Sequence, residues 1–144
     1  MTKKKIIIIA AVVLLGGGYE AKAMVFPPPV VHLKISGTIY VLPKDFTINL
    51  RDGHYATLTV ALVLAPAQSV GTLDASNPPP TGFGTLTEEA AVRAIITNLV
   101  TDETESSLLD PRGRADLEHQ ILVAIRKDTD VQLEQILFTD LAVQ

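Results

Sequence analysis

The chain has 144 residues, 47% of them hydrophobic, a formal net charge of −4 and no cysteine. The lack of cysteine excludes disulfide bonds, thiol catalysis and thiolate metal sites, so packing alone must hold any exported domain together. From Met24 onward, 8 Lys and Arg residues stand against 15 Asp and Glu residues, and this net charge of −7 argues against binding to nucleic acid or to anionic lipid.

The chain begins with three lysines, Lys3 to Lys5, followed by an apolar stretch. This order is typical of a secretory signal peptide, and Ala21-Lys22-Ala23 matches the cleavage pattern of such peptides. Residues 6–26 are equally suited to a membrane anchor, because as a helix they would span roughly 31 Å and a bilayer core is about 30 Å thick. The residues alone leave both interpretations open. In either case the lysines stay in the cytoplasm and the chain after Phe26 is exported.

The anchor interpretation divides the chain into three parts. Residues 1–26 form a cytoplasmic lysine head and a single transmembrane helix, in which the anchor positions include Ile6, Ile9, Val12 and Leu15. Residues 27–30 form a linker whose three prolines end any helix. Residues 31–144 are long enough for one exported domain with a core of its own.

Three strands are predicted in the first half of this domain. Residues 31–42 alternate, with Leu33, Ile35, Ile39 and Val41 on one face, as in a half-buried strand. Gly37 falls in this apolar register and indicates a bulge or a close backbone approach. Residues 46–50 and 54–65 repeat the alternation on either side of a tight turn at Asp52-Gly53. Together they predict a small antiparallel meander.

The second half is predicted to be helical and to end in a strand. After a loop at residues 72–84, Thr87 is suited to cap a helix. Asp110 and Pro111 are suited to begin a second helix. The core-facing stripes of the two helices are Val92, Ile95, Ile96 and Leu99, then Leu117, Ile121, Ala124 and Ile125. Residues 131–144 form a strand with Ile136 and Phe138 on one face and Leu137, Leu141 and Val143 on the other. The predicted fold is α+β, a small antiparallel sheet with two helices packed on one face.

No catalytic or metal-binding pattern stands out in the sequence. His32, His54 and His119 are far apart and lack the spacing of zinc ligands. The acidic residues near the end of the first helix lack the alternating ligands of a calcium loop. The sequence therefore predicts a protein that is not an enzyme and that has no cofactor.

The last third of the chain resembles the FliL family of flagellar basal-body-associated proteins. The matching positions are a Gly-Arg helix start, leucine or isoleucine every four residues, and the ending "ILFTDLAVQ": Gly113, Arg114, Leu117, Ile121, Phe138, Thr139, Val143 and Gln144. "VLPKDFTINLRDGHYATLTVALVL" is similar to the first hairpin of that family.

The resemblance implies a single-pass protein of the inner membrane, with a cytoplasmic N-terminus and its domain outside, and so favours the anchor. It implies partners in the ion-driven stator units of the flagellar motor, of the MotA/MotB type, and a stomatin/prohibitin-like fold that self-associates in rings. The alternative is a small secreted binding module released by cleavage after Ala23. Candidate complementary edges for assembly are two basic and two acidic residues: Arg112, Arg114, Asp102 and Glu105.

Overall fold

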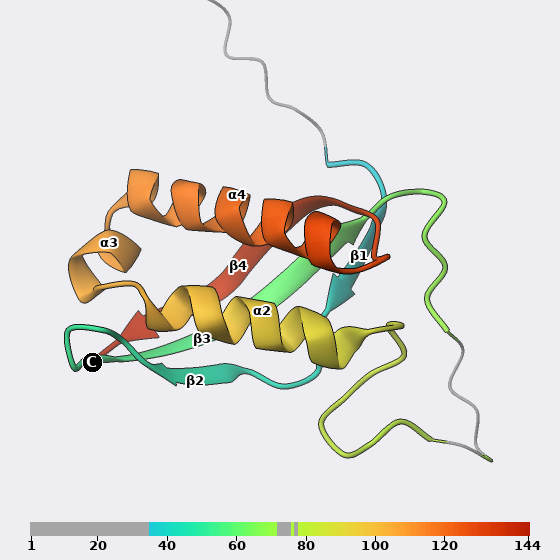
Figure 1. Ribbon diagram of the computed structural model, residues 1–144, viewed down its shortest axis with the longest axis horizontal. Coiled ribbons are helices and arrows are strands. Elements are labelled where there is room, and N and C mark those ends of the chain that lie inside the picture. The colour runs from blue at the N-terminus through green and yellow to red at the C-terminus, as the bar shows by residue number, and fades with distance from the viewer. Residues whose placement is uncertain (1–34, 72–75, 77) are drawn as a thin grey trace, which may run out of the picture. The chain divides into compact units, whose positions relative to one another are not determined.

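The computed structural model describes residues 35–71, 76 and 78–144. Its strands are β1 (Thr38–Val41), β2 (Phe46–Asn49), β3 (Tyr55–Leu64) and β4 (Leu133–Val143). Its helices are α2 (Glu89–Thr101), α3 (Glu105–Leu109) and α4 (Pro111–Asp128). Figure 1 shows α2 and α4 lying across the sheet, with the short α3 joining them at one end.

The sheet is built around β3. β4 runs antiparallel along one edge of β3, and β1 and β2 both pair antiparallel with the other edge, one after the other. The predicted meander, in which β1 would pair with β2, is wrong. Pro43 interrupts this edge, but the backbone N–H of Leu42 still donates to the Val60 carbonyl at 3.0 Å. The chain therefore continues in one direction along β3 and does not reverse.

β1 is shorter than predicted, and its apolar register faces away from the helices. Ile35, Ile39 and Val41 are 45%, 53% and 51% exposed, whereas Tyr40 packs against the core. Gly37 has φ of 116°, and a Cβ there would collide with the Leu64 carbonyl oxygen. The predicted close backbone approach at this glycine is confirmed.

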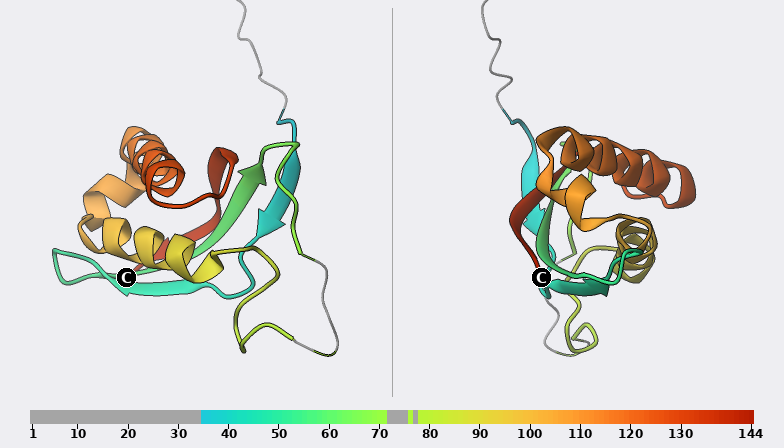
Figure 2. Two further views of the ribbon diagram at one scale, coloured as in Figure 1. Left: turned by 45° about the vertical axis from the view of Figure 1, so that its right-hand side comes forward. Right: turned by 90° about the vertical axis from the view of Figure 1, so that its left-hand side faces the viewer.

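The core lies between one face of the sheet and the helices. Figure 2 shows both long helices on the same side of the sheet. The core side chains contributed by β3, α2 and α4 are Leu58, Val60, Leu62, Leu64, Val92, Ile96, Val100, Leu117, Ile121 and Ile125. The α+β prediction with helices on one face is therefore confirmed, although Ile95 and Leu99 are only partly buried.

The helix starts differ in how well the sequence predicts them. At α4, the Asp110 side chain accepts a hydrogen bond from the Gly113 N–H at 3.1 Å and Pro111 is the first helical residue, as expected. At α2, the predicted cap by Thr87 is wrong, because the preceding residue Glu88 has φ of 61° and no side chain caps the helix. The helix α3 was not predicted; Thr104 caps it by accepting from the Ser107 N–H.

A bulge in β4 reverses the predicted faces at the end of the chain. Thr59 pairs with Asp140 but Val60 pairs with Phe138, so Thr139 is the extra residue. Leu141 and Val143 thereby return to the helix-covered face with Phe138 and pack against the core, which contradicts the prediction of opposite faces. Leu137 pairs with Ala61 on the uncovered face, so the helices cover only one face of β4.

The predicted anchor and linker lie outside the described residues. Ile6, Ile9, Val12 and Leu15 belong to that part of the chain. Within residues 35–144 as far as they are described, no helix combines the length and the apolar composition needed to cross a bilayer.

Candidate functional site

The residues that the structure describes form no metal-binding cluster. No group of three or more His, Asp or Glu side chains is placed there to hold an ion. His119 is exposed on α4, and His32 lies outside the described residues. The histidine that does have close polar neighbours is His54.

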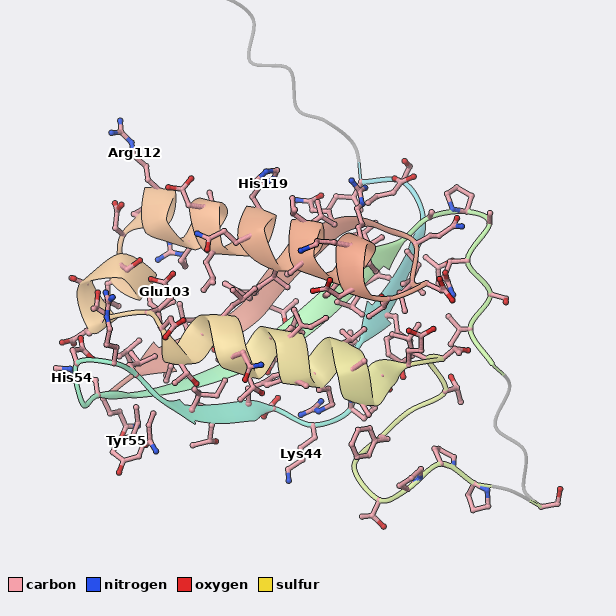
Figure 3. The ribbon with its side chains drawn as sticks, in the orientation of Figure 1. Lys44, His54, Tyr55, Glu103, Arg112 and His119 are labelled. Carbon is pink, nitrogen blue, oxygen red and sulfur yellow. The ribbon has the colours of Figure 1, made fainter. Side chains whose placement is uncertain are left out.

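His54 belongs to a polar clamp, formed with Asp52 and Glu105, that joins the β2–β3 turn to α3. Its Nδ1 lies 3.2 Å from Asp52 Oδ1 and its Nε2 lies 3.2 Å from Glu105 Oε2. The second Asp52 oxygen accepts the backbone N–H of Glu105 at 2.8 Å. This hydrogen bond, with a smaller contribution from His54, lowers the pKa of Asp52. Figure 3 shows His54 at one end of the domain.

The Gly113-Arg114 pair fixes the junction of α3 and α4. A Cβ at position 113 would collide with the Ser107 carbonyl oxygen, so only glycine fits without a shift. The Arg114 guanidinium donates to the carbonyl oxygens of Leu108 and Leu109 at 2.9 and 3.0 Å. It therefore satisfies carbonyls that the end of α3 leaves without helical partners.

The C-terminal residues of the same pattern fix β4 against β3. Phe138 and Val143 pack against the core, and the Thr139 hydroxyl donates to the Thr59 carbonyl at 3.3 Å beside the bulge. Gln144 exchanges two backbone hydrogen bonds with Tyr55, at 2.8 and 2.9 Å. With Leu117 and Ile121 fully buried, the positions that carry the resemblance are structural ones.

The four candidate assembly residues occupy one end of the helical layer. Glu105 and Arg114 already have partners in the chain, as described above. Asp102 ends α2 and Arg112 lies in the first turn of α4, and both are exposed. Figure 3 shows Arg112 pointing away from the domain.

The sheet face that no helix covers carries an apolar patch. We call Ile39, Val41 and Leu137, which surround the buried Ala61 and Val63, the open-face patch. The register places Ile39 opposite Val63 and Leu137 opposite Ala61, so all five side chains share this face. Ile39 and Val41 are exposed and Leu137 is partly buried. Exposed apolar side chains that gather on one surface are typical of a contact surface.

A buried carboxylate, not predicted from the sequence, links β1 to α2. Glu89 is only 3% exposed, and its Oε2 accepts the Tyr40 hydroxyl at 2.7 Å and the Gly84 N–H at 2.9 Å. The Tyr40 oxygen in turn accepts the Leu86 N–H at 3.3 Å. Glu89 stands in the first turn of α2, where an acidic residue is expected to complement the helix dipole, and that local pattern gives no sign of its burial.

An arginine beside the apolar stripe of α2 is the second residue that sequence reasoning missed. Arg93 lies over the ring of Phe46 and lines a cavity at the edge of β2. The only signal in the sequence was its position directly after the core residue Val92.

Comparison with known proteins identifies the chain's relatives. No curated protein matches it. The profile of one family, described as flagellar basal body-associated protein FliL, matches residues 39–144 and thus covers the three helices of the described residues and nearly all of their sheet. The match confirms the resemblance seen in the C-terminal residues and in the first hairpin. The chain therefore belongs to the FliL family of flagellar basal body-associated proteins.

Proposed function

We propose that this protein is a single-pass protein of the inner membrane that sits beside the stator units of the flagellar motor and supports their engagement in rotation. The family match over residues 39–144 carries this proposal. The lysine head and residues 6–26 support the membrane part of it. Residues 6–19 carry no charge, and with residues 20–26, which include Glu20 and Lys22, the segment has the length of about 20 residues that a bilayer span needs.

The length of the chain before the domain limits how far the domain can lie from the membrane. Eight residues, 27–34, separate the apolar stretch from Ile35. At about 3.3–3.6 Å per residue, even a fully extended segment of this length reaches less than about 30 Å. A domain tethered so closely is suited to contact other membrane-bound chains.

We further propose that copies of the protein associate with one another around a stator unit of the MotA/MotB type. The open-face patch supports self-association, because 53% of Ile39 and 51% of Val41 are exposed although neither side chain is polar. A contact built on uncharged side chains avoids the mutual repulsion of domains that each carry a charge of −7 from Met24 onward.

Fractionation of cells tests the membrane part. The protein should stay with the membranes after a carbonate wash and should retain Lys3 to Lys5 at its N-terminus. Recovery of a soluble exported form that begins near Met24 would contradict the anchor and support the secreted binding module.

Crosslinking in intact membranes tests the motor part. The full chain should crosslink to stator subunits, and deletion of its gene should reduce swimming torque. A protein that crosslinks to no stator subunit, and whose loss leaves torque unchanged, would contradict the proposal.

A further inference from the structure

A cavity of about 410 Å³ lies where the chain entering β2, the loop before α2, and α2 itself meet. We call it the Arg93 pocket. Its lining includes two cations, two aromatic rings and three threonines: Lys44, Arg93, Phe46, Phe83, Thr47, Thr81 and Thr97. The volume falls in the range of about 300–1,000 Å³ that is usual for ligand pockets.

The Arg93 guanidinium is held in place but lacks an acceptor. Its central carbon lies 4.2 Å from the ring centroid of Phe46 and 6.0 Å from that of Phe83, which are cation–π distances. Its Nη1 atom is shielded from solvent and has no hydrogen-bond partner in the described part of the chain. The ion pairs found there all involve His54, so no carboxylate neutralises Arg93. A shielded donor of this kind is rare without a partner, and a ligand oxygen would supply one.

A second cation stands at the mouth of the pocket. Lys44 is exposed, and its side chain lies beside Gly82. A Cβ added to Gly82 would be 3.5 Å from Lys44 Cδ. Figure 3 shows the Lys44 side chain pointing outward from the chain that enters β2. The acidic residue of the lining, Asp45, accepts the Thr59 hydroxyl at 2.7 Å and forms no ion pair with either cation. The lining therefore contains two positive groups and one carboxylate, which already accepts a hydrogen bond.

The composition of the lining favours a carboxylate ligand. A planar guanidinium fork matches the two oxygens of a carboxylate, and the threonine hydroxyls offer further donors. Asp45 repels a second negative charge, so a monoanion suits the site better than a phosphate dianion. The two phenylalanine rings can pack against the methylene groups of an acidic side chain.

We propose that the Arg93 pocket binds one Asp or Glu side chain on an exposed segment of a partner polypeptide. This inference does not depend on which motor protein the partner is. It assigns a positive docking point to a domain that is otherwise acidic, so an acidic partner segment would be directed to the Arg93 pocket.

Peptide titration of the full chain in detergent micelles tests the proposal. The probes are a blocked Ala-Glu-Ala tripeptide and a blocked Ala-Gln-Ala tripeptide of the same size. NMR signals of the Arg93 Nε–H group and of the phenylalanine rings report binding. The glutamate probe should shift these signals with an affinity at least about tenfold higher than the glutamine probe, a difference of about 1.4 kcal/mol.

Matched variants separate a binding role from a structural one. Arg93→Gln should abolish the shift of the ring signals, and Arg51→Gln, which removes an exposed arginine from the turn after β2, should leave it unchanged. Because Arg93→Gln also removes the stacking on Phe46, Lys44→Gln serves as a second variant that keeps this contact and should weaken binding a few-fold.

Three outcomes would overturn the proposal. They are equal responses to the two tripeptides, no response to either of them, and tighter binding of inorganic phosphate than of the glutamate probe at the same signals. The last result would mean that the Arg93 pocket is a general anion site.

Discussion

At the scale of single residues, a tyrosine hydroxyl holds a buried carboxylate in place. Glu89 keeps one oxygen, Oε1, without a hydrogen-bond partner in the described residues, so its other oxygen carries the polar contacts. A buried carboxylate is costly unless hydrogen bonds replace its water. The Tyr40 hydroxyl is therefore important both for Glu89 and for the attachment of β1 to the start of α2.

Tyr40→Phe should lower the free energy of unfolding by about 1–3 kcal/mol, because it leaves Glu89 with a single donor, the Gly84 N–H. Chemical denaturation at neutral pH measures the loss. Tyr55→Phe, which changes an exposed tyrosine hydroxyl, is the control and should stay within about 0.5 kcal/mol. Equal effects of the two changes would show that the Tyr40 hydroxyl contributes nothing specific.

The stability difference between the wild type and Tyr40→Phe should depend on pH in the alkaline range. Burial, and then the hydrogen bond to Glu89, raise the pKa of Tyr40 above its ordinary value of 10.0. The folded protein holds this proton more tightly than the unfolded chain does. The contribution of the protonated Tyr40 hydroxyl to stability is therefore complete below about pH 10 and is lost as the pH rises through the raised pKa. The stability difference between wild type and Tyr40→Phe should therefore shrink above pH 10.

Asp52 should affect stability in the opposite pH range. Its pKa is lowered from the ordinary 3.8, chiefly by the Glu105 N–H, so its contribution is present above about pH 4 and is lost as the pH falls through the lowered pKa. Asp52→Asn should reduce the melting temperature at pH 7, and the reduction should diminish toward pH 3. Asp116→Asn, an exposed change on α4, should show no such trend. A reduction for Asp52→Asn that is independent of pH would mean that its charge is not involved.

At the scale of elements, the turn from α3 into α4 depends on the absence of a side chain. Gly113→Ala would normally favour a helix by roughly 1 kcal/mol. Here the added methyl group would collide with the Ser107 carbonyl, so we expect a net loss of about 1–3 kcal/mol in the free energy of unfolding. Gln120→Ala, on an exposed face of the same helix, should stay within about 0.5 kcal/mol. A stabilised Gly113→Ala protein would contradict this account of the junction.

The elements also show which parts of the fold the sequence can predict. The alternation in β3, the stripe of α4 and its Asp110-Pro111 start are local patterns. They were confirmed, except that Ala124 of the stripe is only partly buried. The bulge at Thr139 was not predictable, because it depends on the register against β3 and moves the last residues to the other face. The exposed face of β1 was missed for a similar reason. Alternation indicates that two faces differ but does not say which of them the helices cover.

The candidate sites were harder to predict than the elements. Arg93 and Glu89 acquire their roles from Phe46 and Tyr40, which are more than 40 positions away in the chain. Spacing within one helix carries no signal of such contacts. The positions that resemble the family were readable in the sequence, and the structure shows that they stabilise the fold.

At the scale of the whole molecule, the distribution of charge and apolar surface decides how copies can meet. The domain is acidic, so copies repel one another over most of their surface. The open-face patch is apolar, and a tether in one membrane would raise the effective concentration of the copies. Weak contacts through this patch would then suffice for assembly on the membrane.

Val41→Lys should weaken this association. The matched control is Val123→Lys on α4, because Val41 and Val123 are 51% and 49% exposed and the same charge is added in both proteins. The added lysine lowers the net negative charge equally in both, so general electrostatic repulsion should fall to the same extent. Crosslinking of the full chain in intact membranes should show a roughly tenfold loss of self-association for Val41→Lys, which corresponds to about 1.4 kcal/mol, and little change for Val123→Lys. If both variants associate like the wild type, the copies do not meet through the open face of the sheet. If Val123→Lys alone loses association, the contact lies on α4.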